Sequence, residues 1–434
     1  LFSITNDSWV ESTLASMTLE EKAGQLVFPF ASGRYMSVDS PDYRRLIYLV
    51  DELKVGGLIF FLSNIYDQAV ITNKMQEVAR IPLLISADFE RGVAQRAAEA
   101  TLFPYNMAVG AADDEELTYK MGKVIAKEGL ALGVHQNYAP VADVNNDPFN
   151  PIINVRAFGE DVNLVKRMSN AFFKGVQSGG MIATTKHFPG HGNTSIDSHL
   201  DLPLINVSRS ELNEIELPPF QSNFDNGIMS VMIAHLEVPA VEPEKGIPST
   251  LSEKIVTGLL QEEMGFKGLI VTDAMNMNAI TNYFSAAEAA VLAIKAGNDL
   301  LLMPPDEEIA IDAIYTAVLS GEIPFTQIET SLRKVLAAKR WLGLHKERLV
   351  DVDNLSKIIG NKEHWDLARD IARKSITLVK NDDKLIPVDP GYVKRTSVIT
   401  LADAVDSRRY HHFNKIVENN NVLSLSINPK AKSN

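Results

Sequence analysis

Residues 268–274 (GLIVTDA) contain an unbroken apolar run that leads to a carboxylate, Asp273, and this pattern is the clearest indication of the fold. An unbroken run, rather than one alternating with polar residues, is typical of a strand buried on both faces of a parallel sheet. Seven similar runs occur along the chain, separated by longer segments with helical periodicity. The eight predicted strands are 25–30, 57–61, 82–88, 137–144, 182–188, 231–236, 268–274 and 299–304.

The segments between these runs read as helices. The clearest are residues 115–132, 164–178, 252–264 and 286–296. Strand–helix alternation repeated eight times predicts an α/β fold, a (β/α)8 barrel of the TIM type. The alternative is an open, doubly wound sheet, which propensity alone separates poorly from a barrel.

Polar residues gather at one end of the predicted strands. Asp88, Lys186, His187, His235 and Asp273 all lie at or near the C-terminal end of a run. Barrel enzymes build their active sites at that face, because the loops that follow the strands meet there. The distribution therefore favours a barrel with a site at its mouth.

The pattern changes after the predicted barrel. We place the barrel in residues 1–345, and in 346–434 a linker and an incomplete second α/β domain. There, a helical segment at 365–374 precedes β-rich runs at 376–380 and 397–401, and too few residues follow to close a core.

The composition of the chain argues against several classes of binding partner and chemistry. The chain has 434 residues, no cysteine and a formal net charge of −13. An acidic chain argues against nucleic acid or an anionic membrane as the main partner. Without cysteine, disulfides and thiolate chemistry are excluded. No apolar run reaches the roughly 18–20 residues of a membrane span.

The densest cluster of polar groups is at residues 186–192 (KHFPGHG) and 197–199 (DSH). Three histidines, a lysine and an aspartate are costly to bury unless each has a partner. A carbohydrate could supply these partners through its hydroxyl groups. The alternatives are a phosphate loop, for which the glycine spacing does not fit, a solvated loop with incidental histidines, and a metal site.

The metal alternative rests on His187, His191 and His199. Their spacing fits no helical H-E-x-x-H motif, and no cysteine supports them. We therefore expect neither a metal nor a cofactor, and predict that a chelator leaves activity unchanged. Activity lost in chelator and restored by a divalent ion would overturn this expectation.

Asp197 and His199 are separated by one residue. In an extended loop, side chains at i and i+2 point the same way, so the carboxylate can hydrogen-bond the imidazole. Such a partner fixes the tautomer of the histidine and raises its basicity. The pair is typical of a general acid/base. No serine lies in a nucleophile-elbow pattern.

Several carboxylates and one arginine complete the candidate set. Asp273 could cap the following turn, but with the acid/base loop nearby a nucleophile is the better interpretation. Asp88 could bind sugar hydroxyls, as could Arg156, although a surface ion pair is the usual fate of an arginine. His235 is a further candidate for substrate binding, although it and Asp143 could equally be buried structural residues.

These motifs resemble glycoside hydrolase family 3, and within it the β-N-acetylglucosaminidase branch. The likeness extends from residues 17–22 (MTLEEK) to Met303, and its strongest element is KHFPGHG followed by Asp197-Ser198-His199. The β-glucosidase and β-xylosidase branches lack this loop and take their acid/base carboxylate from a second domain. The resemblance also implies that the residues from Ser397 onward begin the αβα sandwich domain of longer members.

The resemblance implies a role for each matching residue. Asp273 corresponds to the nucleophile, and Asp197 with His199 to an Asp–His acid/base dyad. Four residues correspond to those that bind the sugar to be released: Asp88, Arg156, Lys186 and His187. The sequence departs from the family at Arg91, where a Gly-Gly pair is common.

Together these features predict a retaining, exo-acting hydrolase. It would release terminal β-linked N-acetylglucosamine from peptidoglycan fragments or chito-oligosaccharides. The alternatives are a β-glucosidase, a phosphorylase acting on N-acetylglucosaminides, and a non-catalytic sugar-binding protein. The start at Leu1 rather than Met, with this substrate class, favours export to a bacterial periplasm or cell envelope over the cytoplasm.

Overall fold

The computed structural model describes residues 7–194, 201–382, 384, 386–387, 397–401, 415, 419 and 423–427. The strands are β1 (Val27–Phe28), β2 (Phe30–Ser32), β3 (Gly57–Phe61), β4 (Leu84–Ala87), β5 (Gln136–Asn137), β6 (Ile182–Phe188), β7 (Ser230–Ile233), β8 (Leu269–Thr272), β9 (Leu301–Leu302), β10 (Ser397–Leu401) and β11 (Leu423–Ile427).

The first nine strands close into a barrel. Strands β2 to β8 pair in chain order, each parallel to its neighbour. Strand β9 pairs with β1, and a parallel bridge joins Leu300 to Val271 of β8. β1 and β2 are two parts of one strand interrupted at Pro29, which has no N–H but whose carbonyl still accepts from the Ile59 N–H. Eight strands therefore form the ring, and the predicted barrel is confirmed.

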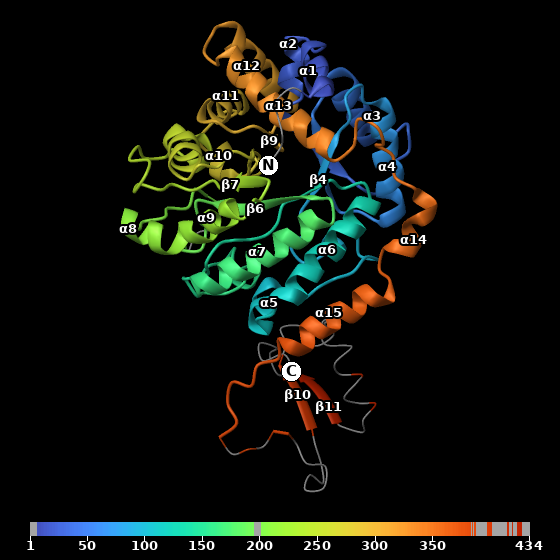
Figure 1. The fold of residues 1–434 in the computed structure, drawn as a ribbon, viewed down its shortest axis with the longest axis vertical. Coiled ribbons are helices and arrows are strands. Elements are labelled where there is room, and N and C mark those ends of the chain that lie inside the picture. The colour runs from blue at the N-terminus through green and yellow to red at the C-terminus, as the bar shows by residue number, and fades with distance from the viewer. Residues whose placement is uncertain are drawn as a thin grey trace, which may run out of the picture. The chain divides into compact units, whose positions relative to one another are not determined.

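Helices surround this ring (Figure 1). The α-helices are α1 (Ser8–Ala15), α2 (Leu19–Gly24), α3 (Pro41–Ile47), α4 (Ile65–Val78), α5 (Asn106–Ala112), α6 (Glu115–Ala131), α7 (Val162–Ser178), α8 (Arg209–Glu211), α9 (Leu217–Asp225), α10 (Asn278–Thr281), α11 (Ala286–Ala296), α12 (Glu307–Leu319), α13 (Phe325–Trp341), α14 (Leu355–Ile358) and α15 (Lys362–Lys374). Short 3-10 turns are η2 (Val93–Gln95), η3 (Asn154–Arg156), η5 (Ser249–Leu251) and η7 (Val352–Asn354), and π-helical turns are η1 (Tyr48–Glu52), η4 (Leu212–Glu216) and η6 (Lys254–Glu263).

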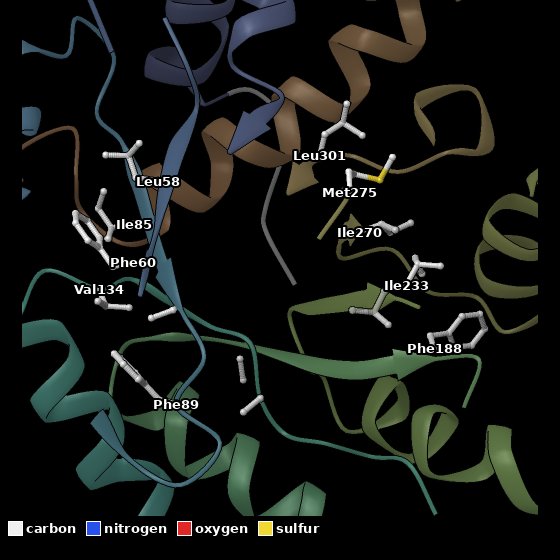
Figure 2. Close-up of a cluster of buried hydrophobic side chains, with 14 of the residues drawn as sticks. Leu58, Phe60, Ile85, Phe89, Val134, Phe188, Ile233, Ile270, Met275 and Leu301 are labelled. Atoms are coloured by element: carbon white, nitrogen blue, oxygen red, sulfur yellow. The ribbon is translucent and has the colours of Figure 1, made fainter. Parts of the chain in front are cut away.

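Alternation along each strand builds two apolar layers. In β3, Leu58 and Phe60 belong to the cluster between sheet and helices, whereas Ile59 belongs to a second, inner cluster. Figure 2 shows Leu58, Phe60 and Ile85 grouped beside β3 and β4. In β8, Ile270 belongs to the outer cluster and Val271 to the inner one. Successive side chains point to opposite faces of a strand, so unbroken apolar runs fill both layers.

Local signals set the helix ends. Asp114 caps α6 by accepting from the Leu117 N–H at 3.0 Å, and Asp161 caps α7 by accepting from the Leu164 N–H at 2.8 Å. A carboxylate at this position satisfies an N–H group that has no partner within the helix. Of the predicted helices, 286–296 agrees with α11 at both ends, whereas 252–264 is a π-helical turn, η6, preceded by η5.

The predicted strand 137–144 is much shorter in the structure. Only Gln136–Asn137 forms β5, and a single bridge joins Val141 to Lys186 farther along. Pro140 has no N–H to donate, which interrupts the pairing at this point. The remaining pairing is made by individual hydrogen bonds, such as that from the Lys186 N–H to the Pro140 carbonyl.

The first compact unit continues to Ile376, beyond the boundary we expected at residue 345. Two features explain the difference. Leu355 of α14 and Ile371 of α15 are fully buried in the outer apolar cluster. Glu128 of α6, also buried, accepts hydrogen bonds from the Gly360 N–H at 2.9 Å and from His364 Nδ1 at 2.6 Å.

The second unit begins at Thr377, and its described strands, β10 and β11, pair in parallel. Strand β10 has the bounds expected for the run 397–401. Residues 376–380 form no strand, and Ile376 and Val379 are exposed. The predicted strand there is wrong, because this segment pairs with no other described strand.

No helix in the described part of the chain combines the length and apolar character needed to cross a bilayer.

We expect Glu128→Ala to lower the free energy of unfolding by about 3–5 kcal/mol, the cost of removing one partner of a buried pair. Glu128 also accepts from Thr101, through its N–H and its hydroxyl, so the change leaves several buried donors unsatisfied. Burial raises the pKa of Glu128, but the bonds from His364 and Thr101 outweigh it and lower the pKa below the usual 4.5. This contribution is therefore complete above pH 4.5 and is lost as the pH falls through the folded-state pKa.

Urea unfolding at neutral and acidic pH measures this effect. The matched control is Glu116→Ala, an exposed glutamate on the same helix, which should cost less than about 0.5 kcal/mol. Equal unfolding free energies for the two variants at neutral pH would contradict the prediction.

Candidate active site

A cavity of about 370 Å³ opens at the C-terminal ends of the barrel strands. Its size is in the range of small-molecule sites. The lining residues come from seven of the strand ends or the loops that follow them: Ile59, Phe61, Asp88, Glu90, Gln95, Arg96, Ile152, Arg156, Lys186, His187, His191, Met232, Asp273, Ala274, Asn276, Met277, Leu302 and Met303. Five predicted site residues, Asp88, Arg156, Lys186, His187 and Asp273, are thus brought together.

Lys186, near the end of β6, lies between two carboxylates that follow β4. Its Nζ is 2.8 Å from Asp88 Oδ1 and 2.9 Å from Glu90 Oε1. The ammonium group is buried, and burial lowers its pKa, but Asp88 and Glu90 outweigh this and raise it. Lys186 is therefore a permanent cation in the cavity wall.

Two arginines complete the network. Arg156 donates to both oxygens of Glu90, at 2.7 and 3.0 Å, and Arg96 donates to Asp88 Oδ2 at 2.6 Å. Burial raises the pKa of each carboxyl, but the cations outweigh it and lower the pKa of Asp88, and that of Glu90 well below its usual value. Both carboxylates stay ionised at neutral pH and can accept hydrogen bonds from hydroxyl groups.

His187 is held by Asp143, which follows β5. The His187 Nδ1 is 2.7 Å from Asp143 Oδ2, and the His187 backbone N–H also donates to this carboxylate. The other ring nitrogen is 3.3 Å from Arg156 Nη2. Burial raises the pKa of Asp143, but His187 outweighs it and the net shift is downward. Asp143, which the sequence left undecided, is thus the anion that orients His187.

Asp273 directly follows β8 and lines the cavity. Its backbone N–H donates to the Ile233 carbonyl, and its Oδ1 accepts from the Ala274 N–H at 2.8 Å. No described residue donates to Oδ2. Burial raises the pKa of Asp273, but the positive potential of His187 and His235, with the Ala274 bond, lowers it overall. An ionised carboxylate with one uncommitted oxygen has the properties that a nucleophile needs.

His235 lies behind this group. It is fully buried, and its ring nitrogens lie 2.6 Å from Thr250 Oγ1 and 3.0 Å from the Ala274 carbonyl oxygen. It is not among the residues that line the cavity. Its position supports the backbone after Asp273, and its role in sugar binding remains a prediction.

Asp197 and His199 lie outside the described residues, which stop at Thr194 and resume at Asp201. The chain that leads towards them is fixed up to Gly192. The His191 N–H donates to Asp143 Oδ1 at 2.8 Å, and Asn150 Nδ2 donates to the carbonyls of His191 and Gly192. The acid/base dyad remains a prediction. Among the described residues, no group of three or more acidic or histidine side chains could hold a metal ion.

Two charged residues of the cavity wall, Glu90 and Arg96, were not predicted as site residues from the sequence. Glu90 is two residues after Asp88, and this spacing on an extended chain could have suggested a second carboxylate on the same side. Arg96 reaches Asp88 because η2 turns the chain back, and no periodicity signals that turn. Arg91, where the sequence departs from the family pattern, places its guanidinium 3.8 Å from the centre of the Tyr105 ring instead of lining the cavity.

The geometry agrees with what comparison with known proteins finds. A β-N-acetylglucosaminidase/β-glucosidase of Cellulomonas fimi is 31% identical over 410 residues, which cover 92% of this chain and 72% of that protein. The structure of a family 3 β-N-acetylglucosaminidase from Paenibacillus sp. str. FPU-7 is 35% identical with a TM-score of 0.84, covering 95% of this chain and 80% of that one.

A third similar protein has another activity in its name. The structure of a β-glucoside phosphorylase is 27% identical with a TM-score of 0.90, over all of this chain and 80% of that one. The model of the glycosyl hydrolase family 3 N-terminal domain matches residues 18–338, which span the barrel from α2 to α13. The match covers the barrel whose strand ends line the charged cavity, and the chain therefore belongs to glycosyl hydrolase family 3.

Proposed function

We propose that the chain is a retaining β-N-acetylglucosaminidase that removes terminal, non-reducing sugars from peptidoglycan fragments or chito-oligosaccharides. The observation that carries the proposal is Asp273, an ionised carboxylate in a cavity that the Asp88–Lys186–Glu90 network also lines. The names of similar proteins support the choice of sugar.

The mechanism uses two groups in two steps. Asp273 attacks the anomeric carbon while His199, oriented by Asp197, donates a proton to the leaving oxygen, and a covalent glycosyl-enzyme forms. His199 then removes a proton from the water that releases the sugar. The network around Lys186 would hold the hydroxyl groups of the sugar, since Asp88 and Glu90 can accept and Lys186, Arg96 and Arg156 can donate.

One comparison tests the substrate. Aryl β-N-acetylglucosaminide and aryl β-glucoside with the same leaving group are offered separately, and kcat/KM is measured for each. We expect clear preference for the N-acetylated sugar. Preference for the glucoside would favour the β-glucosidase alternative. If neither substrate is turned over, the alternative of a non-catalytic sugar-binding protein would be favoured.

A second candidate reaction is phosphorolysis, favoured by the similarity to a β-glucoside phosphorylase. A neutral histidine base repels an incoming anion less than a carboxylate would, so phosphate could replace water in the second step. Products formed with and without inorganic phosphate distinguish the two reactions: the hydrolase releases free sugar in both cases, and the phosphorylase releases a sugar phosphate.

The compartment is part of the same proposal. A substrate derived from the cell wall suits an enzyme exported to the bacterial periplasm or cell envelope. Fractionation of cells that produce the full natural protein tests this.

A further inference from the structure

A further buried carboxyl group, that of Glu216, lies beneath the turn that follows β6 and has no part in the proposed mechanism. Glu216 ends η4 and is 1% exposed. Its Oε1 accepts a hydrogen bond from Asn146 Nδ2 at 3.1 Å. Its Oε2 is buried and accepts no hydrogen bond from any described residue. A buried glutamate with no basic partner is unusual, because an ionised carboxylate there would be poorly compensated.

The turn above Glu216 contains Gly190. A Cβ placed on Gly190 would lie 2.4 Å from Glu216 Oε2, so a glycine is required for the two to approach. The φ of Gly190 is +131°, which also favours glycine. Its N–H donates to the His187 carbonyl at 2.8 Å. The carboxyl of Glu216 therefore packs against the backbone that connects His187, in the cavity, with the segment leading to Asp197 and His199.

The charges near Glu216 disfavour its ionisation. Asp143, the anion that holds the N–H groups of His187 and His191, acts on it from the loop after β5, and Glu211 acts on it from α8. The ring of His191, on the turn itself, is neutral at neutral pH and supplies no compensating charge, since burial and His187 lower its pKa to about 4. Burial, followed by the charge of Asp143, raises the pKa of Glu216 to about 8.

We propose that Glu216 is a positioning residue: held as a neutral acid under the Pro189–His191 turn, it keeps this turn, and with it His187 in the cavity, in place. The inference rests on the proposed function. When Glu216 ionises, it and Asp143 are two buried anions that repel each other, and among the described residues Asn146 alone donates to the new charge. The repulsion loosens the bonds by which Asp143 fixes His187 and His191, and activity falls at alkaline pH.

The test compares the pH dependence of kcat/KM for the wild type, Glu216→Gln and Glu214→Gln, over roughly pH 6 to 10. The substrate is an N-acetylglucosaminide with a strongly activated phenol, whose departure needs little protonation, so titration of His199 contributes little to the profile. Glutamine has the shape and donor capacity of the neutral acid but cannot ionise. Glu214 is an exposed carboxylate on η4, the same element as Glu216, and is the matched control.

We expect the wild type and Glu214→Gln to lose activity with an apparent pKa near 8, and Glu216→Gln to stay active at neutral pH and to lack this limb. The same alkaline limb in Glu216→Gln would overturn the proposal, as would a wild-type profile that stays flat through this range.

A second measurement is independent of turnover and does not need the variant to fold. Infrared difference spectra of the wild type should show the carbonyl stretch of a carboxylic acid that disappears as the pH rises through about 8. No such band at neutral pH would overturn the proposal. An enzyme that turns over no N-acetylglucosaminide but shows the band would instead fail the proposed function and leave the neutral acid in place.

Discussion

Asp273→Ala is expected to lose at least about 10⁴-fold in kcat/KM on every β-N-acetylglucosaminide, whatever the leaving group. The carboxylate forms the covalent bond to the sugar, so its removal raises the barrier of a step that every substrate must pass. Steady-state rates on an activated phenyl glycoside and on a disaccharide measure this. The fall should be similar for both.

Azide sharpens the experiment. A small anion can enter the space left by Asp273 and attack from the same face as the carboxylate. The variant should then regain turnover with activated substrate and release the α-glycosyl azide, which is the inverted product. The control is Asp306→Ala, an aspartate that caps α12 at the protein surface and should leave the rate unchanged. Unimpaired activity in Asp273→Ala would assign the nucleophile elsewhere.

For His199→Ala we expect an effect that depends on the leaving group. An activated phenol departs without a proton, so formation of the glycosyl-enzyme should suffer little. A sugar leaving group needs the proton, and its rate should fall roughly 10²–10⁴-fold. Release of the sugar from Asp273 also loses its base, so the covalent intermediate should accumulate. Mass spectrometry should find one added N-acetylhexosamine on the peptide that contains Asp273.

Azide also allows the two variants, Asp273→Ala and His199→Ala, to be compared directly. In His199→Ala, azide intercepts the glycosyl-enzyme from the opposite face and should release the β-glycosyl azide. The two variants should therefore give opposite anomers from one substrate. Equal losses on both substrate classes, with no adduct on Asp273, would mean that His199 binds sugar and that the proton comes from another group.

Much of the barrel could be predicted because its signal is local. The runs 57–61 and 182–188 match β3 and β6 at both ends, since unbroken apolar sequence bounded by helical periodicity has few other solutions. The boundary of the compact unit could not be predicted in this way. It depends on Glu128 receiving donors from residues more than two hundred positions away, and no pattern near either partner signals that contact.

In the site, too, residues with a local sequence signal could be predicted, and residues placed by irregular loops could not. Asp88, Lys186, His187 and Asp273 could be identified because each lies close to the C-terminal end of a strand, and a barrel brings these ends together. The electrostatic partners could not, because Arg96 and Asp143 reach the site through irregular loops. Glu216 carries no local signal, because its significance comes from a glycine on another element that approaches its carboxyl group.

The contacts of α14 and α15 with the barrel have a consequence for anyone who shortens, fuses or transplants this catalytic module. A chain cut at residue 345 lacks Leu355 and Ile371, so the apolar side chains that pack against them would become exposed to solvent. Glu128 would also lose two of its hydrogen-bond donors. Such a fragment should be prone to aggregate on expression, because exposed apolar surface associates with that of other molecules. The smallest autonomous cassette should extend to Ile376, where the first compact unit ends.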